Sequence, residues 1–149
     1  MLLQPVQAQM LAPAAVLVCW SLIMLAWLAR ARFAAMAKAG FDLKQARPGG
    51  RGQDLQGVLP DPVMWKSHNY THLMEQPTLF YAVVVILALA GPARADLVLA
   101  WGYAALRIIH SLYQATVNNV PVRFTIFGLA TFCLIGLALR AAIVTLGAY

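Results

Sequence analysis

Residues 11–29 read LAPAAVLVCWSLIMLAWLA, a run of 19 residues without a charged side chain. A helix of that length crosses the roughly 30 Å hydrocarbon core of a membrane. Three further apolar segments predict helices over residues 65–90, 95–117 and 122–146. We therefore predict an all-α membrane protein, a multi-pass four-transmembrane-helix bundle that forms a single domain over residues 1–149.

The composition agrees with insertion into a membrane. Hydrophobic residues make up 62% of the chain and charged residues 11%, whereas about a quarter of the residues in a soluble domain are charged. No Lys or Arg precedes the first apolar run, and the run is longer than the signal-peptide core of about 7–15 residues. We expect it to be a membrane-spanning helix rather than a signal peptide.

The basic residues are concentrated around one hydrophilic segment, residues 30–63. They are Arg30, Arg32, Lys38, Lys44, Arg47, Arg51 and Lys66. Basic loops remain on the cytoplasmic side, so this pattern predicts a cytoplasmic loop over residues 30–63 and both termini outside. The same placement accounts for the net charge of +6 without nucleic acid, which we do not expect as a partner.

Polar residues form one face on each of two predicted helices. Positions 107, 110, 111, 114 and 118 are spaced i, i+3, i+4, i+7 and i+11, so they share one side of the third helix. Asn69, His72 and Glu75 fall within about 120° of arc on the second helix. Ionisable groups at membrane depth are costly, so they usually face a partner, a cavity or a ligand.

The predicted topology brings these residues into one layer on the cytoplasmic side, where Arg123 opens the fourth helix. The candidate catalytic residues are Arg107 and Arg123. The candidate ligand-binding residues are Asn69, His72, Glu75, His110, Gln114 and Asn118. Arg140 is about 25 Å from Arg123 along the helix, and we expect it to be an interfacial anchor.

Glu75 and Arg107 are expected to pair, because a carboxylate offsets part of the cost of a guanidinium in hydrocarbon. Two interpretations are compatible with that pairing. The pair either clips two helices together or forms a wall of a site in which Arg107 and Arg123 receive the carboxylates of an anionic ligand.

A metal site is a weaker alternative. His68, His72 and Glu75 have the spacing H-x3-H-x2-E, which can place ligands on one helix face. However, only one carboxylate is present and no cysteine is near, so we predict no metal. Cys19 and Cys133 are isolated in apolar segments and indicate neither a disulfide nor a thiolate site.

Two stretches of sequence carry extended motifs. The second helix carries Asn69-x2-His72-Leu-Met-Glu75-x-Pro77-x-Leu-Phe80-Tyr81. The third helix carries Ala100-Trp101-x4-Leu106-Arg107-x2-His110-Ser111, and its end and the next turn carry Thr116-x-Asn118-x-Val120-x2-Arg123. Together these motifs resemble the family of membrane-associated proteins in eicosanoid and glutathione metabolism (MAPEG), and its bacterial branch most of all. The resemblance covers roughly residues 64–130.

The resemblance implies a left-handed bundle that assembles as a homotrimer in a bacterial inner (cytoplasmic) membrane. It also implies glutathione as a cosubstrate, bound between adjacent subunits near the cytoplasmic side, and lipophilic substrates. An arginine in such a site stabilises the thiolate, which is the reactive form of the thiol.

The sequence departs from the glutathione-transferring members at several positions. His110 and Gln114 stand where those members carry tyrosines, and Arg123 is offset from the position of their second arginine. Two functions are therefore predicted as alternatives. One is a glutathione- or thiol-dependent transferase or peroxidase acting at an intersubunit pocket. The other is a non-catalytic lipid-binding module or an accessory subunit of a larger membrane complex.

Overall fold

The computed structural model describes residues 4–41 and 48–147. This part of the chain is all-helical, with long helices α1 (Pro5–Lys38), α2 (Asp61–Ala90), α3 (Arg94–Thr116) and α4 (Val120–Leu146) and a short 3-10 helix η2 (Gly52–Leu55). The predicted four-helix bundle is thus confirmed. Among the described residues, α1, α2 and α4 are long and apolar enough to cross a membrane. Helix α3 is more polar, because it carries the buried face described below.

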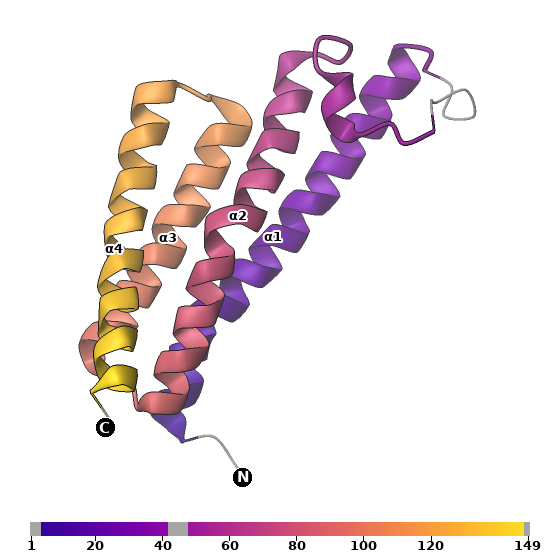
Figure 1. The fold of residues 1–149 in the computed structure, drawn as a ribbon. Helices are drawn as coiled ribbons and strands as arrows, with labels where there is room; N and C mark the ends of the chain where they lie inside the picture. The colour runs from indigo at the N-terminus through magenta and orange to yellow at the C-terminus, as the bar shows by residue number, and fades with distance from the viewer. Residues whose placement is uncertain (1–3, 42–47, 148–149) are drawn as a thin grey trace.

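The helices run side by side (Figure 1). Helix α1 packs along α2, and α3 packs along α4, while α2 also contacts both α3 and α4. The connection from α1 to α2 and the turn from α3 to α4 lie at one end of the bundle, and the start of α1 and the end of α4 lie at the other. Aromatic and aliphatic side chains fill the interior, where Phe80 stacks on Tyr103 with ring centroids 4.3 Å apart. The connection end of the bundle is where the polar residues gather.

Helix α1 is longer at both ends than the predicted residues 11–29. It begins with Pro5 in its first turn, where the missing N–H of proline costs no hydrogen bond. It continues past Arg30 and Arg32 to Lys38, because this stretch consists mainly of Ala, Arg, Met and Lys, which are good helix formers. The charges therefore mark where the helix leaves the apolar layer, not where it ends.

A glycine ends α1. Gly40 has φ +66°, and the N–H of Phe41 donates to the carbonyl of Met36 at 3.0 Å while that of Gly40 donates to Ala37 at 3.2 Å. This is the Schellman arrangement, in which the residue after the cap adopts the left-handed conformation. The predicted loop over residues 30–63 is consequently too long, since it begins only after Lys38 and is interrupted by η2. Lys44 and Arg47 of that loop lie outside the described residues.

Arg140, which we predicted to be an interfacial anchor, also takes part in an ion pair that the sequence did not predict. Its Nε lies 3.7 Å from a carboxylate oxygen of Asp96, whose side chain is 2% exposed, and this is the ion pair found within the described part of the chain. Asp96 also accepts the main-chain N–H of Ala93 at 2.8 Å and so caps the start of α3. The pair joins α3 to α4 at the end of the bundle opposite the polar layer.

Candidate functional site

Two polar helix faces meet in the bundle as the spacing predicted. Arg107, His110, Ser111 and Gln114 of α3 are all buried, and Arg107 is completely so. Asn69 of α2 is also buried and points at this face. Because residues three, four and seven apart share one side of a helix, the whole set can face α2 at once.

Hydrogen bonds join the two faces. The amide of Asn69 donates to the hydroxyl oxygen of Ser111 at 2.9 Å, and the indole N–H of Trp20 in α1 donates to the same oxygen at 3.0 Å. His72 Nδ1 and Gln114 Oε1 are 3.3 Å apart. Ser111 thus connects three helices. Trp20 was not expected in this network, since nothing in an apolar run distinguishes a tryptophan that has a polar partner.

Arg107 contacts α2 through the backbone. Its Nη2 donates to the main-chain oxygen of His72 at 2.7 Å. Its Nε and Nη1 have no hydrogen-bond partner among the described residues, and neither does His110 Nε2 or Asn69 Oδ1. Buried polar groups without partners are rare in proteins, so these atoms mark a place where water, a ligand or another chain can bind.

The prediction of an ion pair between Glu75 and Arg107 is wrong within the subunit. Glu75 is exposed on α2, and no ion pair joins it to Arg107 in the part of the chain that the structure describes. Helix α2 turns Glu75 outward, because Leu73 and Pro77 occupy its buried side. Arg107 does join α3 to α2, but through the main-chain carbonyl of His72 and not through the Glu75 carboxylate on which that interpretation rested.

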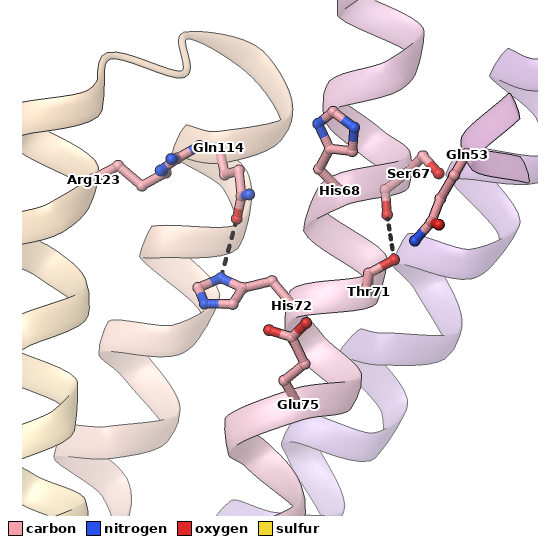
Figure 2. A pocket seen from close by; sticks show the side chains of 8 residues that line it. All are labelled: Gln53, Ser67, His68, Thr71, His72, Glu75, Gln114 and Arg123. Atoms are coloured by element: carbon pink, nitrogen blue, oxygen red, sulfur yellow. Dashed lines mark hydrogen bonds between the residues drawn. The ribbon is translucent and has the colours of Figure 1, made fainter. Parts of the chain in front are cut away.

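A polar cavity of about 300 Å³ opens between α2 and the turn that joins α3 to α4 (Figure 2). His72 and Glu75 line it from α2, and Gln114 and Arg123 line it from the opposite side. Gln53, Ser67, His68 and Thr71 complete the lining. We had not predicted these last four as candidate ligand-binding residues. Gln53 lies in η2, and no periodic pattern in that glycine-rich connection pointed to it.

Arg123 is held at the edge of this cavity by the turn itself. Its Nη1 donates to the side-chain oxygen of Asn118 at 2.6 Å. Asn118 has φ +56°, a left-handed conformation that Asn tolerates better than most residues. The side chain of Asn119 accepts the N–H of Val122 at 3.4 Å and caps α4. The turn therefore fixes the guanidinium beside the opening.

A second, mostly apolar cavity of about 190 Å³ adjoins the first. His72 and Arg123 line both cavities, while His110, Val120, Phe124 and Phe127 line only this one. The ring of Phe127 lies 5.1 Å from that of His72 and 5.7 Å from the guanidinium carbon of Arg107. The two cavities differ in polarity and meet at the imidazole of His72 and the guanidinium of Arg123.

The predicted site residues therefore separate into two groups. His72, Glu75, His110, Gln114 and Arg123 line the cavities, and Asn118 positions Arg123. Asn69 and Arg107 lie beneath them and join α2 to α3. The histidine that suggested a metal site, His68, bonds instead to Gln56 at 3.1 Å. Within residues 4–41 and 48–147, no three His, Cys, Asp or Glu side chains are grouped as metal ligands.

A model of the MAPEG family matches residues 10–143 of the chain. The chain belongs to the MAPEG family. The match covers most of α1 and α4 and all of α2 and α3, so it includes both cavities and the buried polar layer beneath them. This MAPEG chain is a membrane protein with apolar helices. No curated protein and no solved structure matches it.

Proposed function

We propose that this MAPEG protein is a glutathione- or thiol-dependent transferase or peroxidase that acts on lipophilic substrates. The observation that carries the proposal is the meeting of a polar and an apolar cavity at Arg123 and His72. A reaction between a hydrophilic thiol and a membrane-soluble electrophile needs two such compartments with a common boundary. The reacting atoms would then meet at that boundary.

The polar cavity supplies groups that suit glutathione. Arg123 is a cation that can hold a carboxylate or stabilise a thiolate, and the exposed carboxylate of Glu75 can accept from the ammonium group. His72, Gln114 and Thr71 add further hydrogen-bonding groups. The volume of about 300 Å³ is at the lower end of ligand pockets, which are roughly 300–1,000 Å³.

The apolar cavity suits a lipophilic electrophile. Val120, Phe124 and Phe127 form most of its wall, and Phe124 is 74% exposed on the surface that would face lipid. A substrate dissolved in the membrane could therefore enter without crossing water. In the transferase reaction the thiolate sulfur attacks an electrophilic carbon, a C–S bond forms, and the leaving group departs with the electron pair of the bond that breaks.

A homotrimer in a bacterial inner membrane, with both termini outside, is part of the proposal. The position of Glu75, an exposed carboxylate within an apolar helix that is long enough to span the membrane, supports assembly with other copies of the chain. An uncovered charge at membrane depth is unfavourable, so a neighbouring subunit is expected to cover this side of α2. The ligand would then bind between subunits.

The test is the formation of a thiolate on the purified protein. Glutathione added to the protein in detergent should produce the ultraviolet absorbance of a thiolate, and model electrophiles should be turned over. Arg123→Gln should lower turnover by about 100-fold, as removal of a preorganised charge-stabilising donor does. If the unaltered protein shows no thiolate absorbance and no turnover, the proposal of an enzyme is ruled out.

A non-catalytic module is the second candidate, either a lipid-binding protein or an accessory subunit of a membrane complex. The observation that favours it is the burial of His110 and Gln114, which occupy the positions of tyrosines in glutathione-transferring members. Gln114 is hydrogen-bonded to His72 and holds the two helices together. This candidate predicts that lipid or a partner co-purifies in mild detergent and that added glutathione leaves the spectrum unchanged.

A further inference from the structure

A third cavity, of about 350 Å³, lies between α1, η2 and α2 and has a different character from the other two. Leu25 and Leu28 of α1 form its apolar part, and Arg32, Arg51 and Tyr70 form its polar part. It borders the polar cavity, but neither Glu75 nor Arg123 lines it. The reaction proposed above uses none of these five residues.

Arg32 is held in place by a hydroxyl group and by close contact with the backbone of η2. Its Nη2 donates to the hydroxyl of Ser67 at 2.7 Å, and its Nε is buried with no partner among the described residues. The backbone of Gly52 packs against the guanidinium so closely that a Cβ there would stand 2.9 Å from Nη1 and Nη2. The charge is therefore fixed against η2, yet part of its hydrogen-bonding capacity is unused.

Arg51 adds a second cation on the same cavity. The carboxylate that is nearest in sequence, Asp54, accepts the main-chain N–H of Arg51 at 2.8 Å. Among the segments that the structure describes, the ion pair is that of Asp96 and Arg140, and no carboxylate of those segments pairs with Arg32 or Arg51. Two guanidinium groups on one cavity favour an anion with several oxygens, because each guanidinium can donate two parallel hydrogen bonds.

The apolar part of the cavity indicates how that anion would be attached. Leu25 and Leu28 belong to the apolar run of α1, and Arg32 follows one turn later along the same helix. Helix α1 has 34 residues and is roughly 51 Å long, so its basic end extends beyond a hydrocarbon core of about 30 Å. The arginines thus lie where lipid head groups begin, and the leucines lie beside the acyl chains.

We propose that this cavity binds the phosphate group of an anionic amphiphile, with Arg32, Arg51 and the hydroxyl of Tyr70 on the phosphate and Leu25 and Leu28 against the acyl chain. Basic pockets between membrane helices recognise phospholipid head groups through this combination of charge and apolar surface. The phosphate could also belong to a soluble phosphate ester, since the polar contacts would be the same. The inference does not depend on the thiol reaction, because binding is measured without thiol.

The experiment is a lipid titration of the full chain in detergent, followed by native mass spectrometry. Phosphatidylglycerol should bind at least about tenfold more tightly than diacylglycerol with the same acyl chains, because only the former carries a phosphate. Arg32→Gln and Arg51→Gln should each weaken phosphatidylglycerol binding by about tenfold. Arg51→Gln is the safer variant for folding, because its side chain is exposed and bonds to no other described side chain.

Arg30→Gln is the matched control. It removes the same charge from the same helix as Arg32→Gln, but Arg30 is exposed and does not line the cavity. Its effect on phosphatidylglycerol binding should stay within about twofold, as expected for a screened surface charge. If Arg30→Gln weakens binding as much as Arg51→Gln, or if neither cavity arginine matters, attraction to the whole basic surface explains the data and the site is overturned.

Glycerol 3-phosphate separates the two sources of phosphate. If the acyl chain contributes, this soluble ester should bind far more weakly than phosphatidylglycerol, since it has no acyl chain to bury against Leu25 and Leu28. Equal affinity with the same dependence on Arg32 and Arg51 would keep the phosphate site and assign it to a soluble ester. Absence of binding by both compounds would overturn the proposal.

Discussion

Arg107 reaches across from α3 and donates a 2.7 Å hydrogen bond to the main-chain oxygen of His72 in α2. No substitution of an α2 side chain can remove that acceptor, so the junction of the two helices does not depend on Glu75. The carboxylate that we had expected to pair with Arg107 faces outward and is available to another chain or a ligand. Substitution of Arg107 should therefore affect the fold, whereas substitution of Glu75 should affect binding.

Glu75→Gln should leave the fold intact and weaken binding. The free energy of unfolding of the subunit should change by less than about 0.5 kcal/mol, because Glu75 is exposed on the subunit itself. The affinity for glutathione should fall by about tenfold if the carboxylate holds the ammonium group. Thermal unfolding in detergent and a ligand titration measure the two effects.

Arg107→Gln is the comparison for Glu75→Gln. It removes a buried hydrogen bond between helices and should cost about 1–3 kcal/mol of stability. Light scattering should be recorded for both variants. Loss of the oligomer in Glu75→Gln, with the monomer still folded, would show that Glu75 serves assembly rather than the ligand.

The sequence predicted the number of long helices and the convergence of their polar faces, because both follow from periodicity. Apolar runs marked the membrane-crossing parts, and the spacing of Arg107, His110 and Gln114 marked one face of α3. The length of α1 was underestimated, because charges end an apolar run without ending a helix. The Asp96–Arg140 pair was missed, because it joins residues far apart in the chain and no local pattern links them.

The lining of the polar cavity was predictable only in part. His72, Glu75, Gln114 and Arg123 stood out as polar residues within or beside apolar segments. Gln53 comes from η2, in a connection that is polar throughout, so nothing in the sequence distinguished it from its neighbours. Whether such a residue lines a cavity depends on the distances between elements. Those distances follow from how the connection folds back on α2.

Asn118→Gly should reduce activity by releasing Arg123. Glycine accepts the φ of +56° at this position without strain, so the turn should keep its shape. The hydrogen bond of 2.6 Å to Arg123 is lost, and the guanidinium becomes free to leave the cavity. We expect kcat/KM to fall by about tenfold, which corresponds to one charge-assisted hydrogen bond.

Asn119→Gly provides the control for Asn118→Gly, because it also introduces a glycine into the turn but does not remove the side chain that holds Arg123. It removes only the weak 3.4 Å cap on Val122. Activity should therefore be nearly unchanged, and stability should fall by only a few tenths of a kcal/mol. Equal losses of activity in the two variants would point to flexibility of the turn instead of the contact with Arg123.

Asp96→Ala should lower stability without affecting the site. The variant loses both the cap on Ala93 and the pair with Arg140, and the loss of the cap alone costs about 1 kcal/mol. Arg140→Gln loses only the pair, and because its side chain is 37% exposed the cost should stay below about 0.5 kcal/mol. Chemical unfolding in detergent compares them; equal losses would show that the ion pair, not the cap, holds this end of α3.

Phe127→Ala should test whether the two cavities hold two ligands or one. The ring of Phe127 covers His72, His110 and the guanidinium of Arg107, and it forms much of the apolar wall. Its loss should weaken binding of a lipophilic substrate by about tenfold, because burial of such a ring contributes roughly 1.5–3 kcal/mol. The affinity for glutathione should not change, since Phe127 does not line the polar cavity.

Phe132→Ala is the matched control for Phe127→Ala, because Phe132 lies on the same helix, is 72% exposed and lines neither cavity. It should alter neither affinity. If Phe127→Ala weakens both ligands equally, the cavities act as one compartment for a single amphiphile, with its head group at Arg123 and its tail against α4. That result would favour the lipid-binding module over the enzyme, because a transferase needs its two substrates to bind as separate molecules before they meet at the shared boundary.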